Sequence, residues 1–192
     1  MNTDFFNYIY NHPLISGNDL KQIAEAHQKV QFIKGDIILE CGKIANEYYL
    51  IENGLVRVFV YDYNGNEITT DFHGDSEVLI EVSSLFQRVP TKEIMVAITD
   101  VTAWKIDFET FQELFHKIEG FREWGRSWMS QQLFIAKERA VIMHTKSASE
   151  RYIILTNEKP EIIQKAPIKY IASYLGITDT SLSRIRKEIL KN

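Results

Sequence analysis

The side chains best suited to contact another molecule lie in residues 167–189, with the sequence PIKYIASYLGITDTSLSRIRKEI. Apolar residues recur at helical spacing on both sides of Gly176, which predicts two short helices that share an apolar side. Gly176 supplies the turn, because glycine adopts the left-handed conformation at little cost. Small Ala172 lets the two helices cross closely. The pattern predicts a helix-turn-helix, a unit that places its second helix in the major groove of DNA.

Short polar and basic side chains occupy the outward side of these two predicted helices. The expected DNA contacts are Thr178, Asp179, Thr180, Ser183, Arg184, Lys187 and, on the preceding helix, Lys169. Thr178 is also the expected N-cap. Arg184 has the paired donors for a bidentate hydrogen bond to guanine, whereas the lysines meet phosphates. An alternative is a unit that contacts another protein, because the acid at Asp179 repels phosphate, although it can equally accept from cytosine N4.

The charge of the chain is unevenly distributed. The formal net charge is -4, but residues 145–192 carry nine Lys or Arg against five acids, so this part has +4 and residues 1–144 have -8. A basic module attached to an acidic one is typical of a protein with a nucleic-acid partner, although a solvated helix face can also be basic.

The N-terminal part of the sequence predicts two short helices followed by a β-domain. Residues 2–11 and 18–28 have helical patterns, and Asn18 or Gly17 is the expected cap of the second helix. From Val30 to Asp107, short apolar or alternating runs are separated by turn residues, which predicts a sandwich or barrel of six to eight strands. The pairs Asn53-Gly54 and Asn64-Gly65 predict β-hairpins.

Helical spacing returns at Phe108 and continues into one long pattern, residues 119–144, without proline. Its apolar residues form two stripes, one through Trp128 and Ile135 and the other through Leu133. Two stripes need two surfaces to pack against, which we expect to be the β-domain and a second subunit. In the alternative, one stripe covers a groove of the same chain.

The last part of the chain begins with another helix signal. Ser147 and Glu150 have the spacing of a capping box. The helix is expected to continue to Thr156 and to break at residues 157–160. The short apolar pieces around Ile162-Ile163 and Ala166 predict a small hairpin before the final two helices.

These stretches together resemble the superfamily of the cyclic-AMP receptor protein and the fumarate–nitrate regulator. Residues 32–42 resemble its first hairpin, residues 48–60 its second, and residues 148–152 the start of its winged domain. The resemblance covers roughly residues 15–190. It implies an α+β fold with a double-stranded β-helix (a cyclic-nucleotide-binding-like jelly roll) in residues 1–118, a dimerisation helix in 119–145 and a winged helix-turn-helix in 146–192. It also implies a bacterial homodimeric transcription regulator that binds a palindromic DNA operator and has RNA polymerase as a candidate partner.

The resemblance is weakest where family members that bind cyclic nucleotides hold their ligand. Those members have a Gly-Glu pair for the ribose and a Pro-Arg-Ser/Thr-Ala motif whose arginine binds the phosphate. This chain has Ile80-Glu81 and Pro90-Thr91-Lys92 in their places. The candidate effector pocket therefore consists of Glu81, Arg88, Thr91 and Lys92. A threonine cannot replace a guanidinium–phosphate pair, so a small-molecule effector, where one binds, is expected to differ from cyclic AMP. In the alternative, Lys92 or Arg88 takes the place of the missing arginine.

The composition argues against an iron–sulfur cluster, a metal or catalytic site, and a membrane or secreted location. Cys41 is the only cysteine, so an iron–sulfur cluster is excluded. His73 is the only histidine of the β-domain and is interpreted as an ordinary residue beside a turn. The five histidines are scattered and no nucleophile–base pair is visible, so no enzyme, metal or cofactor is expected. The sequence shows neither a membrane span nor a secretion signal, so a cytoplasmic location is expected.

Overall fold

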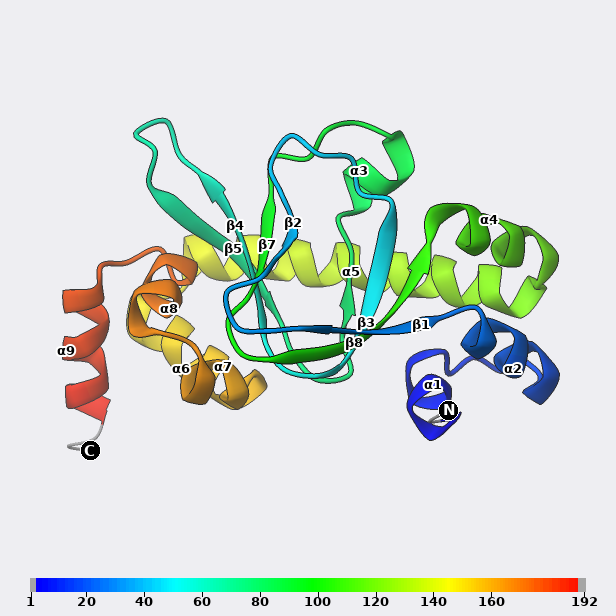
Figure 1. Ribbon diagram of the computed structural model, residues 1–192. Coiled ribbons are helices and arrows are strands. Elements are labelled where there is room, and N and C mark those ends of the chain that lie inside the picture. The colour runs from blue at the N-terminus through cyan, green and yellow to red at the C-terminus, as the bar shows by residue number, and fades with distance from the viewer. Residues whose placement is uncertain (1–2, 190–192) are drawn as a thin grey trace.

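A computed structural model describes residues 3–189 of the chain, with two β-sheets and nine helices in that range (Figure 1). The predicted first helix begins at residue 2 and the predicted DNA-binding domain ends at residue 192, so these two boundaries lie outside the described residues. The helices are α1 (Thr3–Ile9), α2 (Gly17–Glu25), α3 (Val82–Gln87), α4 (Phe108–Lys117), α5 (Glu119–Thr145), α6 (Ala148–Glu158), α7 (Pro160–Lys165), α8 (Ile168–Tyr174) and α9 (Asp179–Ile189).

Eight strands form two antiparallel four-stranded sheets that pack as a sandwich. The first sheet has the order β1 (Gln28–Phe32), β8 (Val101–Asp107), β3 (Glu47–Asn53), β6 (Val78–Leu79). The second has the order β2 (Ile37–Leu39), β7 (Ile94–Ala97), β4 (Val56–Tyr61), β5 (Glu67–His73). Apolar residues of both sheets, including Ile51, Val58 and Ala103, are buried between them. The predicted β-sandwich is confirmed, and each predicted strand is present to within a few residues.

The two turn signals have different outcomes. Asn64-Gly65 joins β4 to β5 in a hairpin, as predicted. The hairpin predicted at Asn53-Gly54 is wrong, because β3 pairs with β6 and β8 while β4 pairs with β5 and β7. At Gly54 the chain crosses between the sheets. A Cβ there would lie 2.5 Å from the carbonyl oxygen of Asp100, and φ is +120°, so only glycine allows this close crossing.

The first hairpin that the resemblance implied, residues 32–42, is absent for the same reason. Strand β1 pairs with β8 and strand β2 with β7, so the chain passes from one sheet to the other at Lys34-Gly35. Each of these connections is a corner of the sandwich, since a glycine with positive φ allows the sharp change of direction. The small strand β6 follows no alternating pattern and was not predicted.

The N-terminal helices pack against the first sheet and the start of α5. Helix α2 begins after Ser16, whose hydroxyl accepts from the backbone N–H of Asp19, while the Asp19 carboxylate accepts from the Ser16 N–H. The predicted caps, Asn18 and Gly17, are therefore wrong, because this capping box satisfies two helix N–H groups one position earlier. The indole of Trp124 in α5 donates to the Ile9 carbonyl at 2.8 Å and attaches α1 to the long helix.

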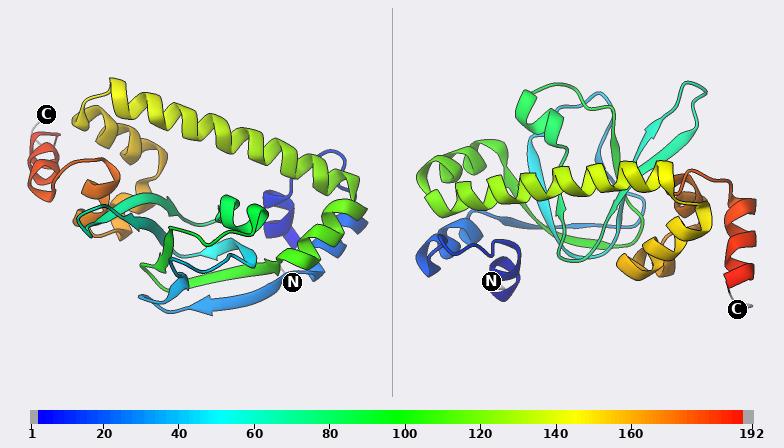
Figure 2. Two further views of the ribbon diagram at one scale, coloured as in Figure 1. Left: turned by 90° about the horizontal axis from the view of Figure 1, so that it is seen from above. Right: turned by 180° about the vertical axis from the view of Figure 1, so that it is seen from behind.

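Helix α5 crosses the whole sandwich and connects it to the C-terminal helices (Figure 2). Its first turns are buried in the core through Phe121 and Trp124. Farther along, Leu133 and Phe134 are each 70% exposed. The helix has two kinds of surface, as the two stripes predicted, and the apolar residues of its outer side have no cover in the described part of the chain.

The regular elements of the described segment after α5 are all helices. Ser147 and Glu150 form the predicted capping box at the start of α6. The hairpin predicted around Ile162 is wrong: Pro160 occupies the first turn of a helix, α7, and Ile162 is buried in a shared apolar cluster. Residues 146–189 contain no strand, so the wing of the predicted winged helix-turn-helix is not found among the residues that the structure describes.

Candidate functional site

Helices α8 and α9 form a compact two-helix unit. Gly176 has φ of +67° in the turn, and the backbone N–H of Ile177 donates to the Ala172 carbonyl at 3.0 Å. The buried residues of the unit are Ile171, Ala172, Leu175, Leu182 and Ile185. The apolar pattern and the glycine turn therefore produce one small core, and the polar positions of α9 remain exposed or half-buried at the surface.

The predicted DNA contacts lie on the outward side of this unit. Thr178 caps α9, because its hydroxyl oxygen accepts from the Ser181 backbone N–H at 3.2 Å. Thr180, Arg184 and Lys187 are exposed on α9, Ser183 is half-buried, and the remaining contacts, Asp179 and Lys169, are exposed near its start. Figure 1 shows α9 at one extreme end of the molecule. Arg184 and Lys187 form no ion pair with the described residues. Their charges remain available for a phosphate or a base edge.

A cavity of about 590 Å³ opens between β2, β3 and the start of α3. Its walls are mostly apolar, with Leu39, Leu79, Ile80 and Met95 among them. Of the four residues predicted for the effector pocket, only Glu81 lines this cavity. Its carboxylate caps α3 by accepting from the Ser84 backbone N–H. The Glu81 carboxylate therefore already has a hydrogen-bond partner within the chain.

The other three predicted pocket residues point elsewhere. Arg88 donates to the Ala45 carbonyl at 2.8 Å and to the Asn46 amide oxygen at 2.6 Å. The Thr91 hydroxyl is buried and accepts from the Glu93 backbone N–H at 2.9 Å. Lys92 is exposed and outside the cavity lining. The structure does not bring these three side chains together with Glu81, and Lys43 is the basic residue that lines the cavity.

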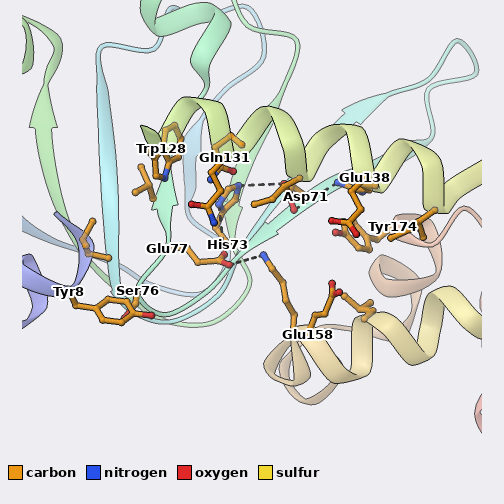
Figure 3. A pocket seen from close by; sticks show the side chains of 18 residues that line it. Tyr8, Asp71, His73, Ser76, Glu77, Trp128, Gln131, Glu138, Glu158 and Tyr174 are labelled. Carbon is orange, nitrogen blue, oxygen red and sulfur yellow. Dashed lines mark ion pairs between the residues drawn. The ribbon is translucent and has the colours of Figure 1, made fainter. Parts of the chain in front are cut away.

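A second hollow, of about 590 Å³, lies where α5, β5 and the C-terminal helices meet (Figure 3). His73 faces the carboxylates of Asp71 and Glu77 there, at 4.0 and 3.9 Å. Burial lowers the pKa of His73 below its usual value. Lys159 forms an ion pair with Glu77 at 2.7 Å. Among the described residues no group of three or more His, Cys, Asp or Glu side chains is arranged to hold a metal ion.

Sequence reasoning did not single out the polar residues that join the β-domain to the C-terminal helices. Arg57 of β4 is 1% exposed and stacks on the Tyr170 ring of α8, with 3.7 Å from the guanidinium carbon to the ring centre. Ser173 of α8 contacts the backbone of β5. The one available signal was a charged residue inside the apolar strand sequence VRVFV, and this signal does not tell which segment covers it.

Residues 29–117 match the family model of the cyclic nucleotide-binding domain. Just under half of the chain is thus similar to this domain. The cAMP-dependent protein kinase regulatory subunit of Debaryomyces hansenii is 32% identical over 96 residues, which are 49% of this chain and 20% of that protein. The chain thus spans about a fifth of the length of the curated relatives it matches. The matched family is one of binding domains, and no catalytic family is indicated.

Solved structures extend the likeness beyond the cyclic nucleotide-binding domain. The catabolite activator protein of Thermus thermophilus matches 95% of this chain and 87% of its own, with 18% identity and a TM-score of 0.61. The c-di-GMP-responsive global regulator CLP of Xanthomonas campestris matches 92% of each chain, with 14% identity and a TM-score of 0.71. At identities this low, the matches show a shared fold alone, and the resemblance to this superfamily is confirmed at the level of the fold. Within residues 3–189, no helix is long and apolar enough to cross a membrane.

Proposed function

We propose that this chain is a dimeric, sequence-specific DNA-binding transcription regulator whose cyclic nucleotide-binding domain senses an effector. In this proposal residues 1–118 form the sensor, residues 119–145 the dimerisation helix and residues 146–192 a helix-turn-helix module. The observation that carries it is the outward side of α9, where Thr180, Arg184 and Lys187 are exposed at the end of the molecule. Their arrangement suits a helix that enters the major groove.

The proposed dimer rests on the outer side of α5. Met129, Leu133, Phe134 and Val141 are exposed there, along three turns of one helix. A row of exposed apolar side chains on a long helix is typical of a helix–helix interface. A two-fold axis along α5 would place two copies of α9 so that they read a palindrome, with half-sites about 34 Å apart.

The proposed sensor has a degenerate phosphate site. Arg88 donates to the Ala45 carbonyl, the Thr91 hydroxyl accepts from the Glu93 backbone N–H, and Glu81 caps α3. A buried phosphate needs a paired cation or several N–H donors, because removing an anion from water is costly. The apolar cavity is suited to a small molecule other than cyclic AMP.

Selection of DNA from a random library, followed by titration of two variants, tests the function. Arg184→Ala should relax the preference at one base pair in each half-site, since a bidentate contact to guanine contributes about 1–3 kcal/mol of discrimination. Lys169→Ala should weaken all sequences about equally and reduce the salt slope by about 1. No enriched palindrome, or an unchanged selected sequence for Arg184→Ala, would refute this assignment.

A second candidate function is a protein-interaction module whose helix pair does not bind DNA. The similarity to kinase regulatory subunits and the acid at Asp179 favour it. Titration of random-sequence duplex DNA at several salt concentrations discriminates between the two, because a DNA-binding protein releases counterions and its affinity falls steeply with salt. A negligible, salt-independent affinity would support the protein-interaction module.

A further inference from the structure

A further cavity, of about 250 Å³, lies between α3, α4 and the first turns of α5. Ile118 alone separates α4 from α5, so the chain turns sharply and α4 folds back beside the long helix (Figure 1). Tyr48 of β3 and Val78 of β6 also line the cavity, so the first sheet contributes one wall. We call this cavity the aromatic pocket, because six of its lining residues have aromatic rings.

The rings come from four different elements. They are those of Tyr48, Phe86, Phe111, Phe115, Trp124 and Trp128. Phe111 meets Tyr48 edge-on at 5.5 Å between ring centres and Phe86 at 5.9 Å, while Trp124 and Trp128 are stacked at 6.3 Å. Aromatic pairs prefer edge-to-face or offset-stacked contacts, so a guest ring inside the pocket would find partners for both.

The polar groups of these rings have partners outside the pocket. The Tyr48 hydroxyl lies 2.8 Å from the Tyr10 hydroxyl, and the Trp124 indole donates to the Ile9 carbonyl at 2.8 Å. The surface that the described residues present to the pocket is apolar throughout. A charged guest would lose its hydration without gaining a partner, and an ordered water needs about two to four polar partners. The chemistry of the lining therefore favours an uncharged, apolar guest.

A glycine keeps one wall of the pocket in place. Gly125 lies inside α5, where glycine is less favourable than alanine. A Cβ at this position would lie 2.6 Å from Cε2 of Phe115. The missing side chain thus lets the Phe115 ring lie against the backbone of α5, and the ring borders the pocket from there. Protein interiors rarely keep spaces larger than a water molecule, so this space beside the core is unusual.

The pocket opens to solvent between α3 and α5. Phe86 and Met129 are 40% and 38% exposed there, and the guanidinium of Arg126 pairs with Glu123 at 2.8 Å. Methionine adapts its shape easily, so Met129 can move aside for a guest. An apolar cavity of about 150 Å³ is enough to bind benzene, and drug-sized ligands need about 300 Å³ or more. The volume of the aromatic pocket lies between these limits and suits a molecule of one or two rings.

We propose that the aromatic pocket binds a small, uncharged aromatic molecule, at a site separate from the effector cavity. The two cavities have one lining residue in common, Ile80. Tyr48 and Tyr49 are neighbours in β3 and line the pocket and the effector cavity, respectively. The first sheet and Ile80 therefore separate the two spaces. The proposal goes beyond the proposed function and does not depend on DNA binding.

Titration with para-fluorotoluene, followed by fluorine NMR, tests the proposal in the wild-type protein. We expect saturable binding with a dissociation constant of about 1 mM or tighter, which is within reach of so small a ligand. Proton–nitrogen NMR of the indole groups reports the location. The chain has three tryptophans, of which Trp124 and Trp128 line the pocket and Trp104 does not. The first two indole signals should shift with added ligand, while the signal of Trp104 stays in place.

Two pairs of variants at exposed positions test whether the pocket is the site. Met129→Trp fills the mouth and should weaken binding at least about tenfold. Its control is Leu133→Trp, one turn later on α5, at a position that is 70% exposed and outside the lining. Phe86→Asp adds a carboxylate at the mouth and should weaken binding to a similar degree. Its control is Val89→Asp, 42% exposed and also outside the lining. Circular dichroism checks that all four variants are folded.

A second copy of the chain is the competing occupant, since Met129 lies on the outer side of α5. Replacing Leu133 and Phe134 with glutamate removes the apolar side chains through which such a copy would pack. Binding by this double variant alone would show that a second copy fills the pocket and would overturn the proposal. The absence of saturable binding by both proteins would overturn it as well.

The remaining outcomes concern the place and the class of the ligand. A shift of the Trp104 signal alone, or equal binding by Met129→Trp and Leu133→Trp, would place the ligand elsewhere and overturn the proposal. Equal affinity for para-fluorobenzoate, which adds a carboxylate to the same ring, would overturn the chemical class. None of these results bears on the selection of DNA, so the proposed function is tested independently.

Discussion

Thr178 caps α9 and is also a proposed DNA contact, and the two roles can be separated by experiment. Its hydroxyl accepts from the Ser181 N–H and caps the helix. Thr178→Ala should therefore lower the free energy of unfolding by about 1 kcal/mol, the usual cost of a lost cap, before it alters DNA specificity. Thermal melting measures this loss. The control is Thr180→Ala, because Thr180 is exposed two residues after Thr178 and does not cap the helix. Equal melting temperatures of the two variants would contradict the capping role.

The buried ring of His27 predicts that the stability of the protein depends on pH. Its Nδ1 donates to the Ile23 carbonyl at 2.7 Å, so its Nε2 accepts from the Tyr10 hydroxyl at 2.9 Å, and the neutral ring suits both partners. Burial lowers the pKa of His27 from 6.5 to about 4. Between these values the unfolded chain binds more protons than the folded one, so stability falls as the pH drops from about 6.5 to about 4.

The expected loss from His27 is about 3 kcal/mol over this pH range. Burial lowers the pKa of His73 as well, so part of the pH dependence has the same sign but a different source. Urea unfolding at several pH values, for the wild type and for His27→Gln, measures the share of His27, because glutamine stays neutral. Identical pH dependence in both proteins would show that the His27 ring does not control stability.

Helices and strands whose patterns are local were predictable from the sequence. The capping box at Ser147 and the turn at Gly176 were correct because the residues that define them are adjacent in the chain. Asn53-Gly54 was misinterpreted because a glycine with positive φ serves a hairpin and a sheet-to-sheet corner equally well. Only the pairing of β3 with distant β8 decides between the two.

The contact of Arg57 with helix α8 was not predictable for a related reason. Arg57 alternates with Val56 and Val58 along β4, which places it on the outer face of the sheet, where a charged residue normally meets water. Helix α8, more than a hundred residues later, covers this position. The candidate effector pocket was likewise placed by motif, whereas the hydrogen bond of Arg88 to the distant Ala45 carbonyl is a tertiary contact that no motif reveals.

The exposed apolar side chains of helix α5 predict that two copies of the chain form a dimer. The structure places Trp128 against the core and Ile135 in the wall of the hollow beside β5, so the outer residues Leu133 and Phe134 are the sharper test. Replacing both with glutamate should convert a dimer into a folded monomer, because charges would be buried at the interface. Sedimentation measures this. A wild-type protein that is monomeric at micromolar concentration would contradict the proposed dimer.

Ligand binding is a property of the whole molecule, and the cavity chemistry predicts a negative result. Cyclic AMP at millimolar concentration should not raise the melting temperature, since the cavity lacks an arginine for the phosphate. A ligand at 100 times its dissociation constant would add about 2.7 kcal/mol to stability and shift the melting temperature by several degrees. A shift of that size would show that cyclic AMP binds in some other way.

The strand order has a consequence for how the chain is made. Gln28 in the first strand pairs with Lys105 in the last, and β8 lies between β1 and β3 at the centre of its sheet. During synthesis the first sheet cannot close until the ribosome has released residue 107, and β1, which pairs with β8 alone, must remain unpaired until then. Long-range pairing of this kind slows folding and leaves apolar strands exposed to aggregation. Nascent chains should therefore depend on chaperones until β8 emerges, and the helices that follow it fold onto a domain that has only just formed.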